Sequence, residues 1–394
     1  MNLLLIGHDA NRAGAQLVLL QLMRLLREQG VQMHLLLGEG GPLLADYQAL
    51  APVTLWPAES AHVAGPVADK VLGKLGLWEK QHQKQQAIRQ QAIRQQLNLD
   101  TVDLVLVNTV TSSRWFAQLD LPKPVPVVTF VHELAMSVRI YTRPDELRHL
   151  LQRTTHMLAV SKATASYYVD EQGFDPARIT LFTLIDTPTL QQNVAKAQQG
   201  NGPARLSQLG IPSGAVVVGG CGNAEWRKGN DLFVSLARLV ANRNLAVPVH
   251  FVWVGMPDGP YRDDLWLDVQ KAGLTDRVHF VAPTPNVLEY TTQFTLFALT
   301  SREDPYPLVV LEAGLCGVPV VCFDGAGGSP ELIETDAGVV VPYLALDAMA
   351  GAIEALANDP ARTRQLGTRL REKILERHPA EQGVATLLEL FERL

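Results

Sequence analysis

Two stretches of the sequence share one plan: LLLIGHDANRAGAQLVLLQLMRLL at 3–26 and VVVGGCGNAEWRKGNDLFVSLARLV at 216–240. Each begins with an apolar run of strand length, continues into a loop that contains glycine, and ends in an amphipathic helical pattern. A Rossmann-type α/β unit begins with this order of strand, glycine loop and helix. The sequence therefore predicts two such domains in tandem.

Working outward from these stretches, short apolar and β-branched runs alternate with helical patterns along most of the chain. This alternation is typical of βαβ units and of a mainly parallel sheet. The strands that we predict are 3–6, 34–37, 104–107, 127–131 and 157–160, followed by 216–219, 250–254, 278–281, 296–299, 318–323 and 339–341.

The domain boundary is predicted where the periodic pattern stops. A chain of 394 residues is too long for one ordinary hydrophobic core. A stretch rich in Thr, Pro, Asn, Gln and Gly at 183–212 interrupts the pattern. We therefore predict an N-terminal domain over 1–185, a C-terminal domain over 186–379 and a helix over 380–394. A ligand shared by the two domains is expected between the carboxyl ends of their strands.

Composition and charge exclude several classes of protein. The chain has 47% hydrophobic and 19% charged residues and no continuous 18-residue apolar stretch, so we expect a globular protein without a membrane span. A formal net charge of −6 disfavours general nucleic-acid binding, which needs a concentrated basic face. The N-terminus lacks the basic residues of a signal peptide, so we expect a cytoplasmic protein.

One segment departs from this charge balance. Residues 70–97 carry six basic side chains against the single acid Glu79, and 81–97 consists of good helix formers with few apolar positions. An exposed surface helix is one interpretation of this pattern. The other is a basic helix that contacts a membrane surface or an acceptor.

The stretch SREDPYPLVVLEAGLCGVPVV at 301–321 places two carboxylates eight positions apart. Pro307 suits a first helical turn, so a helix is expected to begin near Leu308 with its free amides ready for an anion such as a diphosphate. Asp304 precedes those amides, whereas Glu312 lies deeper in an apolar segment, where a carboxylate needs partners. The vicinal hydroxyls of a ribose would supply them. Alternatively, Asp304 is a helix N-cap and Glu312 pairs with a structural base.

Four further positions are candidates for substrate contacts. Arg227 and Lys228 lie in a glycine-flanked loop after a strand, where two cations suit a diphosphate, although such a pair is often merely solvated. Gly14 begins a predicted helix and allows close approach of the backbone to an anion. His132 directly follows a strand and is either a contact to substrate hydroxyls or a satisfied strand-end histidine.

Several cofactor motifs are absent from the sequence. It contains no Asp-x-Asp, and its ten histidines form no HxH or HExxH cluster, so a metal-chelated diphosphate is disfavoured. It also lacks G-x-G-x-x-G after the first strand and any P-loop, which disfavours a dinucleotide dehydrogenase or a P-loop NTPase. We expect neither a metal ion nor a cofactor.

Together these motifs resemble the retaining glycosyltransferases of family 4, which have the GT-B fold. That family carries E-x7-E, then "xGxPVV" and "GGxPE". Here these motifs correspond to Asp304-x7-Glu312, CGVPVV at 316–321 and GAGGSPE at 325–331. The first acid is Asp rather than the commoner Glu, and Asn223 stands where the family has an Arg.

The resemblance implies a role for each site residue. Glu312 would bind the donor ribose, and the amides near Tyr306, Pro307 and Leu308 would hold the diphosphate. Gly14 would approach the phosphates from the first domain, with Arg227 and Lys228 as cations in the second. The catalytic set would be Asp304, which positions the sugar, His132, which contacts the sugar near the reacting carbon, and Lys228, which stabilises the leaving diphosphate. The helix 380–394 would cross back to the first domain.

The implied activity is metal-independent transfer of a hexose from a nucleoside-diphosphate sugar to an acceptor hydroxyl, with retention of configuration. Surface polysaccharide or lipid-linked glycan assembly is the expected setting, and 70–97 would contact the inner face of the cell membrane. A GT-B epimerase and a non-catalytic nucleotide-sugar-binding or assembly protein remain as alternatives. A phosphorylase is disfavoured, because no lysine is a clear candidate for pyridoxal phosphate.

Overall fold

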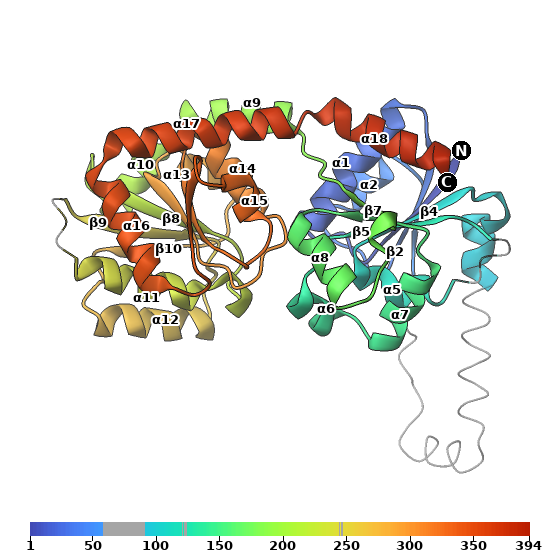
Figure 1. The fold of residues 1–394 in the computed structure, drawn as a ribbon, viewed down its shortest axis with the longest axis horizontal. Helices are drawn as coiled ribbons and strands as arrows, with labels where there is room; N and C mark the ends of the chain where they lie inside the picture. The colour runs from blue at the N-terminus through green and yellow to red at the C-terminus, as the bar shows by residue number, and fades with distance from the viewer. Residues whose placement is uncertain (58–90, 120, 122–123, 244, 246) are drawn as a thin grey trace, which may run out of the picture. The chain divides into compact units, whose positions relative to one another are not determined.

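The computed structural model describes residues 1–57, 91–119, 121, 124–243, 245 and 247–394. They form two compact units, each built on one sheet (Figure 1). Unit 1 comprises Met1–Ala159, Gly173–Thr180 and Val384–Leu394, and unit 2 comprises Val160–Gln172 and Leu181–Gly383. Residues 160–172 and 181–185, which we assigned to the first domain, group with unit 2, and most of the last helix groups with unit 1.

The sheet of unit 1 has seven strands in the order β3-β2-β1-β4-β5-β6-β7. Its pairings from β3 to β6 are parallel. The apolar runs are buried because helices cover both faces of such a sheet. The strands are β1 (Asn2–Gly7), β2 (Gln32–Leu37), β3 (Val53–Leu55), β4 (Leu104–Asn108), β5 (Val127–Val131), β6 (His156–Ala159) and β7 (Ile179–Leu181).

The helices of unit 1 connect successive strands, and the last one comes from the end of the chain. Helix α1 begins at Gly14, as predicted, and buries the apolar stripe that includes Leu19, Leu22 and Leu26. The α-helices are α1 (Gly14–Glu28), α2 (Leu44–Gln48), α5 (Ser113–Phe116), α6 (Ala135–Tyr141), α7 (Pro144–Arg153) and α18 (Ala380–Arg393).

The sheet of unit 2 has six strands in the order β10-β9-β8-β11-β12-β13, and every pairing is parallel. Because β8 and β11 are neighbours, the loops that follow them meet at the carboxyl edge of the sheet. The strands are β8 (Val216–Cys221), β9 (Val249–Val254), β10 (Val278–Val281), β11 (Leu296–Leu299), β12 (Val320–Phe323) and β13 (Gly338–Val341).

Helices pack on both faces of this second sheet and bury two hydrophobic clusters, one around Phe233 and Phe251 and the other around Phe297 and Leu311. The α-helices are α8 (Lys162–Asp170), α9 (Thr187–Gln198), α10 (Gly202–Gln208), α11 (Asn230–Ala241), α12 (Pro260–Lys271), α13 (Val287–Thr291), α14 (Leu308–Leu315), α15 (Ser329–Ile333), α16 (Leu346–Asn358) and α17 (Pro360–Arg377).

The predicted strands coincide with strands of the structure, with small differences at their ends. The predicted strand 318–323 begins two residues later, at Val320, because Pro319 has no N–H to donate to the ladder. The edge strands β3 and β7 were missed, because each has only three residues and shows no periodic pattern.

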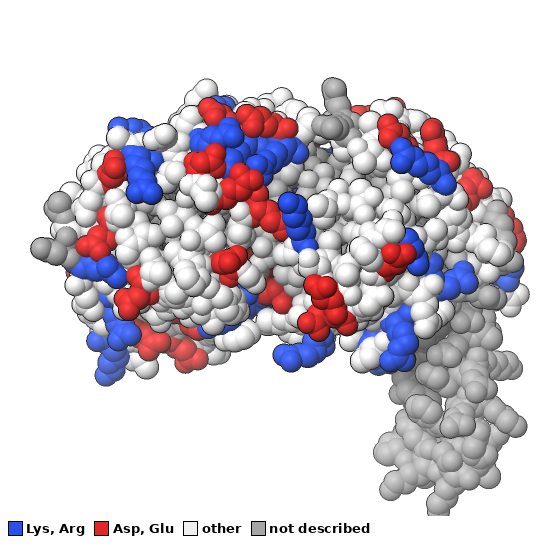
Figure 2. Space-filling view, viewed as in Figure 1, with Lys and Arg blue, Asp and Glu red and all other residues white. Residues whose placement is uncertain are grey.

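Ion pairs fix α17 to the segment between α15 and β13. Lys373, which is buried, donates to Glu334 at 2.6 Å and also to Asp336. Arg377 pairs with Glu334 at 2.8 Å and Arg369 with Asp336 at 3.0 Å. Figure 2 shows basic side chains gathered beside acidic ones over this helix. The positive charge of α17 is therefore largely matched locally.

The segment of unusual charge is described only at its end. Residues 91–97 are helical, and Ile93 and Leu97 are buried. The rest of the proposed membrane contact, 70–90, lies outside the described residues. None of the described helices has both the length and the apolarity of a membrane span.

Candidate functional site

Two oppositely charged loops meet at the carboxyl edge of the unit 2 sheet. Lys228 ends a short 3-10 helix, Trp226–Lys228, after β8, and its Nζ donates to Oδ2 of Asp304 at 2.6 Å. The Ser301 hydroxyl donates to the same oxygen at 3.0 Å, and an Arg227 nitrogen lies 3.8 Å from Oδ1. The structure thus brings three of the predicted residues together, although Lys228 and Asp304 lie 76 positions apart in sequence.

Arg227 is held by several acceptors of this loop pair. Its guanidinium pairs with Glu225 at 2.7 Å and donates to the Glu303 carbonyl at 2.9 Å. Only 19% of its side chain is exposed, so Arg227 lies against the Asp304 loop instead of extending into solvent. The two cations therefore concentrate positive charge around one carboxylate.

Gly229 determines how Lys228 is presented. Its φ of +69° is the left-handed conformation, and a Cβ there would lie 2.0 Å from the Thr300 carbonyl oxygen. The Thr300 hydroxyl donates to the Gly229 carbonyl at 2.9 Å and to that of Lys228 at 3.3 Å. The glycine thus allows the β8 loop to contact the end of β11 directly.

Replacing Gly229 by alanine is expected to lower the free energy of unfolding by about 3 kcal/mol or more, because left-handed strain and a backbone clash act together. The matched control is Gly210→Ala, since Gly210 has φ of +76° but open space around its Cβ position. Its cost should be about 1 kcal/mol. Chemical denaturation of both variants checks the difference, and equal costs would show that the close approach to Thr300 is unimportant.

The glycine-rich loop 325–331 packs directly on the Asp304 loop. The Asp304 amide donates to the Ala326 carbonyl at 2.6 Å, and the Gly328 amide donates to the Pro305 carbonyl at 2.9 Å. A Cβ on Gly327 would lie 1.9 Å from the Asp304 carbonyl oxygen. The "GG" of this motif therefore permits two loops to touch along their backbones, a role that the motif alone does not reveal.

Glu331, the last residue of that motif, caps a helix. Its carboxylate accepts the amides of Lys162 and Ala163 at 2.9 and 2.8 Å, at the start of α8. Sequence reasoning did not assign this residue a role. The spacing Ser-Pro-Glu before an apolar pair offers no signal of a partner 169 positions away.

Helix α14 begins at Leu308, as predicted, but Pro307 is its N-cap and not part of its first turn. Among the described residues no side chain caps this end. The Val310 amide donates to the Pro307 carbonyl at 3.1 Å, which leaves the amides of Leu308 and Val309 available to an anion. Tyr306 contributes its backbone to this loop, while its hydroxyl forms a hydrogen bond of 2.8 Å with Nε2 of His378. Its phenol is therefore already bound, and only the backbone there remains for a ligand.

Glu312 is a half-buried acid without a partner. In the described chain no hydrogen bond or ion pair reaches its carboxylate, and desolvation raises its pKa to about 7. Its charge helps to raise the pKa values of the Cys221 and Cys316 thiols. The alternative that Glu312 pairs with a structural base does not hold among the described residues. A carboxylate in this state suits a ligand that brings hydrogen-bond donors.

The other two predicted residues, Gly14 and His132, belong to unit 1. His132 directly follows β5, its Nε2 lies 3.0 Å from Oδ1 of Asn108, and desolvation lowers its pKa to about 3. Gly14 begins α1, and a Cβ there would have no neighbour within 4 Å among the described residues. Packing against these residues therefore does not require glycine at position 14.

The sequence did not single out two buried residues of unit 1, Asn108 and Glu133. Asn108 is the last residue of β4, and Glu133 accepts the backbone amides of His132 and Val110 at 2.9 and 3.3 Å. The signal that identified His132, a polar residue where a buried strand ends, applies equally to Asn108.

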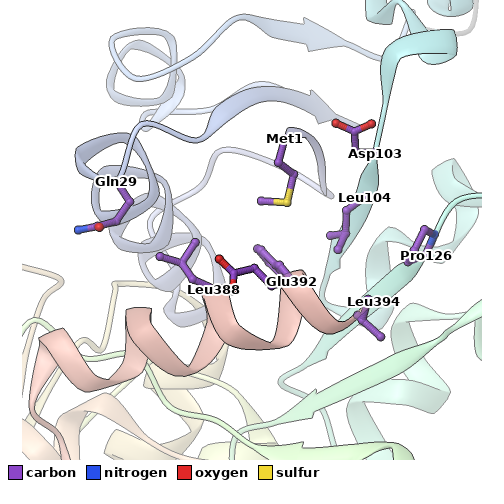
Figure 3. A pocket seen from close by; sticks show the side chains of 9 residues that line it. Met1, Gln29, Asp103, Leu104, Pro126, Leu388, Glu392 and Leu394 are labelled. Carbon is purple, nitrogen blue, oxygen red and sulfur yellow. The ribbon is translucent and has the colours of Figure 1, made fainter.

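A cavity of about 600 Å³ lies elsewhere in unit 1 (Figure 3). It is lined by Asp103 and Leu104, just before and at the start of β4, and by Leu388 and Glu392 of α18. It is therefore at the amino-terminal edge of the sheet. Ligands of parallel sheets bind at the carboxyl ends of strands, so this cavity is separate from the candidate site.

Comparison with known proteins gives consistent family matches over most of the chain. Residues 12–182 match the family model described as Glycosyltransferase Family 4, and residues 204–373 match that described as Glycosyl transferases group 1. Each match covers most of one of the two predicted domains.

Two curated relatives and one solved structure illustrate the similarity. The lipopolysaccharide core biosynthesis mannosyltransferase LpsB of Rhizobium meliloti is 27% identical over 295 residues, 71% of this chain and 79% of that protein. The D-inositol 3-phosphate glycosyltransferase of Rhodococcus erythropolis is 27% identical over 199 residues, 49% of this chain but only 44% of that protein. The fold resembles that of Anabaena Alr3699/HepE in complex with UDP-glucose, with a TM-score of 0.75, 19% identity and full coverage of both chains.

Proposed function

The chain belongs to the group 1 glycosyltransferases of family 4 and has their two-domain, Rossmann-like GT-B fold, and on that premise we propose its reaction. A hexose passes from a nucleoside-diphosphate sugar to an acceptor hydroxyl, with retention of the anomeric configuration and without a metal ion. The observation that carries this proposal is the convergence of Lys228 and Arg227 on the Asp304 loop, next to the uncapped start of α14.

The donor's diphosphate would be neutralised by protein groups in place of a metal. Lys228 and Arg227 supply fixed positive charge, and the first amides of α14 supply hydrogen-bond donors with the positive end of the helix dipole. In support, the sequence has no Asp-x-Asp with which to chelate a metal-bound diphosphate. Glu312 would accept hydrogen bonds from the ribose hydroxyls, which explains why it has no partner in the described chain.

Retention follows from how such a site would act. The cations and amides stabilise the departing diphosphate, and the acceptor attacks from the face that the leaving group occupied. The leaving phosphate oxygen takes the acceptor proton, so no residue forms a covalent intermediate. Asp304 then positions the sugar and Lys228 rather than acting as a nucleophile. Identifying the product anomer by NMR tests this stereochemistry.

The proposed setting is the assembly of a surface polysaccharide or lipid-linked glycan, with a glycan or lipid-linked glycan as acceptor. LpsB, a relative, is named as a mannosyltransferase of lipopolysaccharide core biosynthesis, and the solved neighbour binds UDP-glucose. We place the enzyme in the cytoplasm, with peripheral contact to the inner face of the cell membrane through 70–97. That contact rests on the basic character of the segment.

A non-catalytic nucleotide-sugar-binding protein is the second candidate. It is favoured by the mutual neutralisation of Lys228 and Asp304 and by Asn223 at the position where the family has an Arg. Release of free nucleotide that depends on a glycan acceptor separates a transferase from such a protein. Release from donor alone indicates an epimerase-like enzyme instead.

The first experiment is a calorimetric titration of the EDTA-treated protein with UDP, GDP and ADP. One nucleotide should bind without metal, and Glu312→Ala and Lys228→Ala should each weaken it at least about tenfold, or 1.4 kcal/mol. Absence of binding by all three nucleotides, with and without added Mg²⁺, would contradict the proposed function.

A further inference from the structure

A network of polar side chains lies at the carboxyl ends of β1, β4 and β5 in unit 1. Asn108 ends β4 and Thr109 directly follows it, and each is 1% exposed. Thr109 has φ of +70°, a conformation that costs a β-branched residue about 1–3 kcal/mol. A strained backbone conformation of this kind is stable only where the surrounding residues hold it. The hydrogen bonds of Asn108 and Thr109 show which side chains are held in place here.

The orientation of Asn108 follows from its two partners. Its amide nitrogen donates to the Ala15 carbonyl, in the first turn of α1, at 3.1 Å. A carbonyl oxygen can only accept, so the amide nitrogen must face Ala15 and the amide oxygen must face His132. That oxygen lies 3.0 Å from Nε2 of His132.

This orientation decides the tautomer of His132. An amide oxygen cannot donate, so Nε2 must carry the hydrogen. A neutral imidazole carries only one, and Nδ1 is then a bare lone pair. Desolvation keeps the ring neutral, with the pKa of His132 lowered to about 3. In the described chain Nδ1 has no hydrogen-bond partner of its own.

Glu133 holds the backbone of the same residue. One carboxyl oxygen accepts the amides of His132 and Val110, and the hydroxyls of Thr109 and Thr111 also donate to this carboxyl. Burial raises the pKa of Glu133 to about 7, although these hydrogen bonds act to lower it. These bonds tie the end of β4 to the end of β5. His132 is therefore fixed twice, at its backbone by Glu133 and at its ring by Asn108.

The other side-chain hydrogen bonds of this network form a chain from Gln16 through His8 and Thr109, in which each group donates to the next and the last donates to Glu133. The Gln16 amide donates to Asp9 at 2.6 Å and lies 2.9 Å from Nε2 of His8, which must then accept. His8 carries its hydrogen on Nδ1, which lies 3.3 Å from the Thr109 hydroxyl. Since that hydroxyl donates to Glu133, every donor along this chain has an acceptor.

We propose that Asn108 is a positioning residue. It holds His132 in the tautomer whose Nδ1 accepts a hydrogen bond from a hydroxyl of the sugar substrate. The identification of the ligand as a sugar rests on the proposed function. The polarity alone already excludes a phosphate as the partner of Nδ1, because ionised phosphate oxygens only accept. His132 contacts a hydroxyl and does not protonate a leaving group.

The test is the ¹⁵N spectrum of the imidazoles in ligand-free, full-length protein labelled at histidine, with His132 assigned by its loss in His132→Gln. Wild-type His132 should show a protonated Nε2 and an unprotonated Nδ1, unchanged between pH 5 and 8. Asn108→Ala should lose this fixed tautomer. Asn108→Asp should place a carboxylate beside the ring and raise the midpoint of its titration by about one to three pH units.

Asn242→Asp, at an exposed position after α11, is the matched control and should leave the His132 spectrum unchanged. A protonated Nδ1 in the wild type, or a His132 tautomer that survives Asn108→Ala, would overturn the proposal. A merely structural role for Asn108 would alter stability but not the tautomer. Because no nucleotide is present, this result stands or falls separately from the transferase activity.

Discussion

Lys228→Ala is expected to lower the rate of glycosyl transfer by about a hundredfold to a thousandfold. Lys228 is the cation closest to Asp304, at 2.6 Å, and lies beside the uncapped start of α14. Removing it takes away a fixed positive charge from the place where the proposed diphosphate develops its negative charge. The measurement is release of nucleoside diphosphate from sugar derivatives of the nucleotide that calorimetry identifies, with glycan acceptors and with water.

The same substitution should also destabilise the protein, which complicates a single-variant experiment. The side chains of Lys228 and Asp304 are only 14% and 7% exposed. Truncating one member of such a pair leaves a buried charge without its partner and costs about 3–5 kcal/mol. A loss of activity in Lys228→Ala could then reflect unfolding rather than lost catalysis.

The double variant Lys228→Ala, Asp304→Asn separates the two effects when it is compared with Asp304→Asn alone, because Asp304 also has a proposed role in positioning the sugar. The neutral amide needs no cation, and Ser301 remains as a partner for it. Stability should recover by most of the amount that the single variant loses, whereas the transfer rate should stay low. If the rate recovered together with stability, Lys228 would be a structural residue and the leaving-group role would be wrong.

The central strands of both sheets could be predicted because parallel strands buried on both faces are continuous apolar runs, such as Leu104–Asn108 and Leu296–Leu299. The resemblance to family 4 glycosyltransferases is confirmed, and so is the fold. The edge strands β3 and β7 were not predicted, because three residues are too few to show a periodic pattern. The order of the strands within each sheet could not be predicted from local sequence patterns either.

That order explains what the sequence could not show of the site. Lys228 follows β8 and Asp304 follows β11. The two residues meet because β8 lies beside β11 in the sheet as well as beside β9, the next strand in sequence. Nothing in the sequence of either loop indicates that the two loops form an ion pair. The sequence suggested a sugar contact for Asp304, and in the structure its carboxylate binds Lys228 and Ser301. Glu312 could be singled out from the sequence, because an acid within an apolar helix is unusual whichever elements that helix packs against.

Glu312→Gln is expected to stabilise the ligand-free protein at pH 8 and to weaken nucleotide binding. Burial raises the pKa of Glu312 to about 7 from an ordinary value of 4.5. Between these values the folded state binds more protons than the unfolded state, so the free energy of unfolding contributed by Glu312 falls as the pH rises. Above pH 7 the full penalty is present, about 3 kcal/mol. Below pH 4.5 it vanishes.

Glutamine carries no charge, so the gain from Glu312→Gln should appear with rising pH. Thermal unfolding should show a higher midpoint than wild type at pH 8, by several degrees, and no gain at pH 4. The matched control is Asp268→Asn, which removes an exposed charge from α12 and should shift the midpoint little at either pH. A gain that was equal at pH 4 and pH 8 would contradict the burial argument.

Nucleotide binding should change in the opposite direction. Ribose hydroxyls that donate to the ionised Glu312 would compensate its desolvation, so the affinity of wild type should fall as the pH drops below 7. Glu312→Gln should bind about tenfold more weakly at pH 8 and lose this pH dependence. Calorimetric titration of both proteins at pH 6 and pH 8 tests this. A variant that was both more stable and an equally tight binder would show that Glu312 does not contact the nucleotide. The burial of Glu312 thus lowers the stability of the free protein, and the hydrogen bonds that a ribose donates to it would recover this free energy as binding affinity.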